Sequence, residues 1–186
     1  MTQVLHAPES TARPADAAVT PCSLLRMAVG REVLAVPIDA VREILEVGRL
    51  TALPRTPDFV RGVMNLRGAV VPVVDLSARI GQGVTRVGRR TCIVVVEVNG
   101  TDAHEGSSDE CFDRGLVVGL MVDAVFEVFD TDASRIEPVP MLGTSIRADY
   151  LSGMARARGD VVGVLAIDRV LSLGDLASAI ASYQPH

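Results

Sequence analysis

Short aliphatic runs, broken by glycine, proline and charged residues, make up most of the chain after residue 22. Such runs at close spacing are typical of the β-strands of barrels and sandwiches. The pattern predicts strands over residues 24–29, 33–37, 69–74, 92–98, 116–122 and 161–167. The protein is therefore expected to be mainly β.

A few short helices are expected between these strands. The three- and four-residue spacing of a buried helix face occurs at Ile38, Val41, Ile44 and Leu45. A second helical turn is predicted over residues 56–61, with Phe59 pointing inward. Near the end of the chain, Asp168 is expected to cap a short helix over 170–171, and a further helix is expected over 173–180.

The chain also contains an internal repeat. The segment D-A-V-R-E-I-L at 39–45 matches D-A-V-F-E-V-F at 123–129, an offset of 84 that also carries Pro54 onto Pro138. Gly62 and residues 67–71 match Gly153 and residues 158–162 at an offset of 91. Two halves of about 70 residues would each be marginally stable alone, so we expect them to pack together around one core. The alternative is that the matches are only a common amphipathic pattern.

Two segments differ in composition from the rest. Residues 1–22 are rich in Ala, Thr and Pro without a hydrophobic period, which predicts a disordered leader before a folded domain at 23–186. Residues 99–114 hold five acids and one Arg, which predicts a solvated acidic insertion between two strands. A cation site there is the alternative, but the acids lack the order of a calcium-binding loop.

Charge and hydropathy exclude several classes of protein. The longest apolar runs are shorter than the ~18 residues that cross a bilayer, and the N-terminus does not resemble a secretory signal, so we expect a cytoplasmic protein without membrane insertion. The net charge of -5 disfavours nucleic-acid binding. The basic cluster Arg86, Arg89 and Arg90 has no aromatic neighbour in the sequence and is interpreted as a solvated turn.

No reactive constellation is visible. The three histidines are at positions 6, 104 and 186, the three cysteines are widely spaced, and all eighteen basic residues are Arg. These positions match no nucleophile–base pair, metal motif or phosphate-binding loop, so neither a cofactor nor a metal is expected. Asp75 and Asp168 each follow a predicted strand and form the one candidate acid/base pair, although each is better explained as a cap. A binding module is therefore favoured over an enzyme.

The densest candidate for a binding surface is the segment 57–76. Gly62 and Gly68 permit positive φ or close chain approach at two bends. Arg67 would present its guanidinium from the turn between them as an anchor for a partner. Alternatively, Arg67 closes the turn by bonding a carbonyl or pairs with Asp75, and the sequence does not distinguish these roles.

At these residues the chain resembles the CheW family, the adaptors that couple bacterial chemoreceptors to the histidine kinase CheA. The likeness extends over most of residues 23–175 and includes F-V-R-G-V-M-N-L-R-G at 59–68 and G-L-M-V-D at 119–123. It is most specific in N-L-R-G at 65–68 followed by P-V-V-D-L at 72–76. The resemblance implies two SH3-like β-barrel subdomains sharing a hydrophobic core, in agreement with the repeat.

The resemblance also implies two sets of contact residues. A chemoreceptor hairpin tip is expected to dock between the subdomains on Val41, Gly62, Arg67, Gly119, Val125 and Val128. The regulatory domain of CheA is expected to pack on Ile44 and Val70 of the first barrel and on Met141 and Leu142 of the second. Such an adaptor would be recruited to membrane-associated receptor arrays.

Three alternatives remain at this point. The adaptor belongs to a non-flagellar chemosensory pathway, controlling pili, biofilm or second-messenger output. A second alternative is a hydrolase that uses Asp75 or Asp168. A third is a small barrel that binds nucleic acid. The chain departs from the family pattern at two places. Ala124 in place of the usual Gly is a small change, whereas the long acidic insertion leaves open whether the partners are those of the flagellar pathway.

Overall fold

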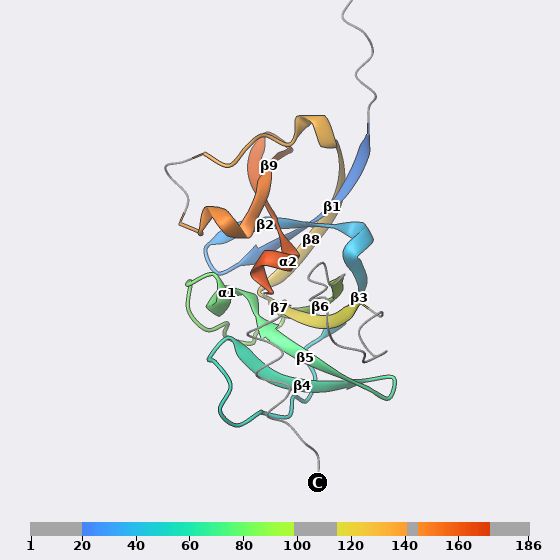
Figure 1. The fold of residues 1–186 in the computed structure, drawn as a ribbon, viewed down its shortest axis with the longest axis vertical. Helices are drawn as coiled ribbons and strands as arrows, with labels where there is room; N and C mark the ends of the chain where they lie inside the picture. The colour runs from blue at the N-terminus through green and yellow to red at the C-terminus, as the bar shows by residue number, and fades with distance from the viewer. Residues whose placement is uncertain (1–19, 99–114, 141–144, 172–186) are drawn as a thin grey trace, which may run out of the picture.

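The computed structural model describes residues 20–98, 115–140 and 145–171, which form two five-stranded sheets stacked along the long axis of the molecule (Figure 1). The strands are β1 (Pro21–Val29), β2 (Glu32–Pro37), β3 (Val41–Glu46), β4 (Val60–Leu66), β5 (Ala69–Asp75), β6 (Cys92–Val98), β7 (Leu116–Val122), β8 (Ala124–Asp132), β9 (Leu151–Ala157) and β10 (Asp160–Leu165). The short helices are α1 (Leu76–Arg79), α2 (Ile167–Val170) and the 3₁₀ turns η1 (Ile38–Ala40), η2 (Ala133–Arg135) and η3 (Ala148–Tyr150).

The two sheets have the same topology. The first subdomain has the strand order β3-β6-β7-β5-β4, and the second has the order β8-β1-β2-β10-β9. Each contains one parallel pair, β5 with β7 and β10 with β2, and a one-turn helix follows the hairpin β4–β5 in the first and β9–β10 in the second. Both sequence matches fall on equivalent strands, which supports duplication over a chance pattern. The second subdomain is completed by β1 and β2, so the repeats are not simply the two halves of the chain.

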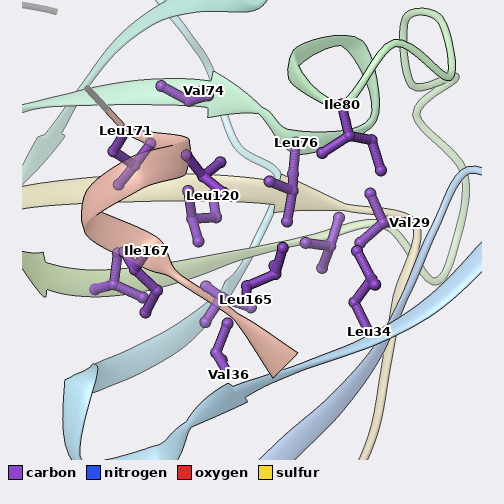
Figure 2. Packing of buried hydrophobic residues seen from close by; sticks show 14 of the residues in the cluster. Val29, Leu34, Val36, Val74, Leu76, Ile80, Leu120, Leu165, Ile167 and Leu171 are labelled. Atoms are coloured by element: carbon purple, nitrogen blue, oxygen red, sulfur yellow. The ribbon is translucent and has the colours of Figure 1, made fainter. Parts of the chain in front are cut away.

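One hydrophobic core joins the subdomains. Its largest cluster combines Val74 and Leu120 of the first subdomain with Leu34 and Leu165 of the second. Figure 2 shows these side chains meeting between the sheets, next to the turn of α2. Each subdomain adds a smaller apolar cluster of its own. The mainly β fold with two SH3-like subdomains and a shared core is therefore confirmed.

Most of the predicted strands are present with small changes at their ends. Five of the six predicted runs lie within β1, β2, β5, β6 and β7, and the sixth, 161–167, overlaps β10 but extends two residues beyond its end at Leu165. The strand β1 begins at Pro21, two residues before the predicted start of the folded domain. The strands β3, β4, β8 and β9 were missed. These strands are less uniformly apolar in sequence. In β3 and β8, half-buried and exposed positions alternate, so polar residues interrupt the aliphatic ones.

The predicted helix on Ile38, Val41, Ile44 and Leu45 is wrong. Only Ile38–Ala40 form a 3₁₀ turn, after which the chain continues as β3. The strand is favoured because Val41–Glu46 pairs with β6, which satisfies backbone groups that a short exposed helix would leave to water. The alternation turns Ile44 outward and leaves it 43% exposed, whereas the helical pattern would have buried it.

Two other helix predictions need correction. No helix forms over residues 56–61: a turn closed by a hydrogen bond from the Val60 N–H to the Pro57 carbonyl leads directly into β4, although Phe59 does pack against the core. The helix after β10 exists as α2, but its N-cap is Ala166, and Asp168 lies exposed in its first turn. The predicted helix at 173–180 lies outside the described residues.

Candidate protein-binding surfaces

The hairpin between β4 and β5 presents Arg67 at the surface. Arg67 and Gly68 form a two-residue turn with φ of 52° and 90°, the geometry that matches the twist of antiparallel strands. The Asn65 side chain accepts a hydrogen bond from the Gly68 N–H at 2.9 Å. This turn holds the backbone at Arg67 in place while 80% of its side chain remains exposed.

The contacts of Arg67 differ from both structural alternatives considered from the sequence. Its guanidinium lies 3.0 Å from a carboxylate oxygen of Glu43 on β3, and not against Asp75 or a turn carbonyl. It is Arg61 that approaches Asp75, at 3.6 Å. An exposed ion pair of this kind adds little stability, so the guanidinium can exchange Glu43 for an acceptor on a partner at small cost.

The second subdomain repeats this arrangement. Arg158 and Gly159 form the turn between β9 and β10 with φ of 49° and 90°, and Arg158 forms an ion pair with Glu127 on β8. Glu127 is the counterpart of Glu43 at the offset of 84, and Arg158 is the counterpart of Arg67 at the offset of 91. The duplication therefore preserved a turn arginine and its glutamate partner on both subdomains.

An exposed aliphatic pair lies on the same two strands of each subdomain. Ile44 on β3 and Val70 on β5 are 43% and 61% exposed. Their repeat counterparts Val128 on β8 and Val161 on β10 are 50% and 52% exposed. Val161 was missed in the sequence, although its offset of 91 from Val70 would have identified it. Exposed aliphatic residues at matching positions are candidates for protein contacts.

The residues expected to face a receptor occupy different environments. Arg67 and Val128 are exposed, whereas Val41 and Val125 are half-buried and pack against the shared core. They lie on both subdomains, with Val41 on β3 and Val125 on β8. A single partner that contacts all of these residues must therefore span the junction between the subdomains.

The two glycines of that set have structural constraints of their own. A Cβ atom at Gly62 would overlap the backbone of Thr51, because Thr51 and Val63 pair across this edge of the sheet. Gly119 is buried in β7, where a Cβ atom would lie 2.7 Å from the Ile93 side chain. Met141 and Leu142, predicted to contact a kinase, lie outside the described residues.

Phe126 is a surface feature that the sequence reasoning missed. It is 43% exposed on β8, with the guanidinium groups of Arg26 and Arg90 centred 5.6 and 5.5 Å from its ring. Arg90, which has no aromatic neighbour in the sequence, thus lies over a ring of the other subdomain. The one sequence signal for an exposed Phe126 was its position between Val125 and Val128 in the repeated segment.

Asp75, which the sequence offered as a catalytic acid or base, has a structural role. Asp75 is fully buried and accepts hydrogen bonds from Ala78 and, through both carboxylate oxygens, from Thr85. It is the N-cap of α1, as expected from the sequence. Burial raises the pKa of the Cys92 thiol, which keeps it protonated. Within the described ranges there is no group of three potential metal ligands, and no helix is long and apolar enough to cross a membrane.

Two barrels that share a core and repeat an exposed arginine and aliphatic pair define a protein-binding scaffold. The family model for the CheW-like domain matches residues 23–174. The chain belongs to the CheW family of chemotaxis scaffolding proteins.

Comparisons with individual proteins agree with this assignment. The chemotaxis protein CheW of Rhizobium meliloti (strain 1021) is 33% identical over 147 residues, covering 79% of this chain and 85% of the relative. Protein FrzA of Myxococcus xanthus is 34% identical over 145 residues, covering 77% and 81%. The crystal structure of scaffolding protein TtCheW from Thermoanaerobacter tengcongensis is similar with a TM-score of 0.66 at 28% identity, covering 84% of this chain and 91% of that chain.

Proposed function

We propose that this protein is a non-enzymatic adaptor that couples chemoreceptors to the histidine kinase CheA. The observation that carries the proposal is the repeated surface: each subdomain offers an exposed aliphatic pair beside a turn arginine. An adaptor needs two separate contact faces, since one partner on each face allows it to join them in an extended assembly. Individually weak contacts then add through avidity.

The receptor face is proposed to include Arg67, Val41, Val125 and Val128. An amphipathic helical hairpin fits such a surface, because its apolar residues would contact the valines of both subdomains while Arg67 bonds a carboxylate or carbonyl at the edge. Gly62 and Gly119 are proposed to act by permitting the close packing that shapes this face.

The kinase face is proposed to include Ile44 and Val70 on the first subdomain, with Met141 and Leu142 as the candidates on the second. The CheA regulatory domain would cover these side chains. The adaptor would then act in the cytoplasm, bound to receptor arrays at the membrane.

A second candidate keeps the fold and changes the pathway to a non-flagellar chemosensory system. A relative with a different name, Protein FrzA, is 34% identical to this chain and a chemotaxis protein CheW is 33% identical, so sequence identity alone does not fix the pathway. Isolation of the protein from its native cell, with identification of the co-purifying kinase and receptors, distinguishes them.

Replacing Arg67 with alanine is expected to weaken binding to receptor hairpins by about 1–3 kcal/mol, through loss of a charge-assisted contact. The Arg67→His variant should show a similar loss. Thermal unfolding should change little, because the Arg67 side chain is 80% exposed. Co-sedimentation with receptor-containing membranes measures the first effect and calorimetry measures the second.

The matched control is Arg158→Ala, which removes the counterpart arginine from the second subdomain. Receptor affinity should stay within twofold of the unmodified protein. A large fall in the unfolding temperature of the Arg67 variant would instead assign that residue a structural role.

Replacing Val70 with glutamate is expected to weaken binding of the CheA regulatory domain at least tenfold, because the new carboxylate would be desolvated at an apolar contact. Stability should be unchanged, since Val70 is 61% exposed. Isothermal titration calorimetry with the isolated regulatory domain measures the affinity. Val161→Glu, at the equivalent position of the second subdomain, is the control and should have a smaller effect. Equal losses would refute a kinase site on the first subdomain.

A further inference from the structure

Arg79 connects the two subdomains through directional contacts. It ends α1 in the first subdomain, and its Nε donates a hydrogen bond of 2.7 Å to the carbonyl oxygen of Val170 in α2. Its guanidinium carbon lies 4.5 Å from the ring centroid of Phe59 in the first subdomain and 5.6 Å from that of Tyr150 in the second. One half-buried side chain thus contacts elements of both repeats.

These contacts lie where the two repeats meet. Phe59 and Tyr150 are counterparts at the offset of 91, and so are Arg79 and Val170. The backbone confirms the equivalence: the Asp75 N–H donates to the Phe59 carbonyl at 2.7 Å, and the Ala166 N–H donates to the Tyr150 carbonyl at 2.9 Å. Arg79 therefore lies between two related aromatic rings and bonds the backbone of its own repeat counterpart.

The remaining contacts across this junction include a large apolar cluster. Apolar burial is non-directional and tolerates small rotations of one barrel against the other. A hydrogen bond and a planar guanidinium against a ring restrict distance and angle. Val170 has no side-chain donor with which to make a second, symmetry-related contact. Other directional contacts join the subdomains, among them a 3.3 Å hydrogen bond from Gln82 to Ser145 and Arg90 over Phe126, but Ser145 and Arg90 are exposed, whereas Arg79 is half-buried.

We propose that Arg79 is a positioning residue that sets the orientation of the two subdomains. The inference deepens the proposed function and rests on it in one respect: a receptor hairpin would contact residues of both subdomains at their junction, whereas Ile44 and Val70, the part of the proposed kinase face on described residues, lie on the first subdomain. Loss of Arg79 is therefore expected to weaken receptor binding more than kinase binding, which keeps its contact at Ile44 and Val70.

The test compares Arg79→Met with Arg147→Met. Arg147 also lies over Tyr150, at 5.1 Å, but it belongs to the same subdomain as that ring and pairs with Asp149. The Arg79 variant should bind receptor hairpins at least tenfold more weakly, and its affinity for the CheA regulatory domain should fall by a smaller factor. The Arg147 variant should retain both affinities. If Arg79→Met does not fold, Arg79→Lys, which keeps the charge but lacks the planar Nε donor, replaces it.

A second measurement does not depend on the proposed partners. The native cysteines are changed to alanine, and spin labels are attached at Arg49→Cys in the first subdomain and Ser134→Cys in the second. Pulsed electron paramagnetic resonance then measures the distance between the two labels. The distance distribution should broaden with Arg79→Met and stay narrow with Arg147→Met. An unchanged distribution, or an equal loss of both partner affinities together with a lower unfolding temperature, would overturn the inference. Failure of the unmodified protein to bind receptor or kinase would reject the proposed function, and the label distances would still test Arg79.

Discussion

Replacing Asp75 with alanine is expected to lower the free energy of unfolding by about 3–5 kcal/mol, as is usual when one partner of a buried charged network is removed. Asp75 is fully buried and accepts hydrogen bonds from the Ala78 N–H at 3.2 Å, the Thr85 N–H at 2.8 Å and the Thr85 hydroxyl at 2.8 Å. Arg61 lies 3.6 Å away. The variant would leave these donors without their acceptor in the protein interior and would remove the cap of α1.

Asp168→Ala is the matched control, because Asp168 lies exposed in the first turn of α2, the counterpart of α1. Its effect should stay within about 0.5 kcal/mol, as for most surface changes. Urea denaturation followed by circular dichroism measures both values. A small effect at Asp75 would contradict a structural role and would favour the acid/base hypothesis instead. Under that hypothesis, Asp75→Asn abolishes a hydrolytic activity and leaves the fold intact.

Replacing Gly62 with alanine is expected to destabilise the protein by about 3 kcal/mol or more, since both backbone strain and a backbone clash are introduced. Gly62 has φ of 130°, which side chains rarely allow, and its Cβ would lie 2.8 Å from the carbonyl carbon of Thr51. Thr51 cannot withdraw easily, because its N–H and carbonyl form two 2.8 Å hydrogen bonds with Val63. Thermal unfolding of the purified variant measures the effect.

Gly48→Ala provides the control, since no atom lies within 4 Å of a Cβ there and φ is not in the left-handed region. It should leave the unfolding temperature nearly unchanged. Gly153→Ala should also destabilise the protein but by less, because its Cβ would lie 2.9 Å from the Glu137 carbonyl oxygen while its φ is outside the left-handed region. If Gly62→Ala instead unfolds like the parent protein and still loses receptor binding, Gly62 is a direct contact residue.

The surroundings of Arg67 show which part of the binding surface was predictable from the sequence. Arg67 was recognised because it lies between Gly62 and Gly68, two expected bends of the chain, and the structure has a turn at Arg67 and Gly68. Its partner Glu43 was not recognised, because 24 residues separate the two and only the folding of the sheet brings β3 to the tip of the β4–β5 hairpin. The contact of Arg90 with Phe126 was missed for the same reason.

Local patterns were informative where backbone pairing and side-chain preference agree. Continuous aliphatic runs such as Ile93–Val96 are buried on both faces and identified β6 without knowledge of its neighbours. The segment Val41–Glu46 has a spacing that also suits a helix, and pairing with β6 made it a strand. That pairing turned Ile44 from an expected core residue into an exposed one.

The amino-acid sequence alone determined that the chain is a duplicated, mainly β protein without an evident reactive centre. Turns and aliphatic runs can be recognised from neighbouring residues, and the absence of suitable nucleophile–base pairs can be recognised from the positions of the few His and Cys residues. The folded arrangement decided that β1 and β2 complete the second subdomain, that Asp75 is held by Thr85 and Arg61, and that Arg79 lies between Phe59 and Tyr150. Such contacts join residues distant in sequence, and they depend on how two sheets pack around a common apolar core, which no local pattern specifies.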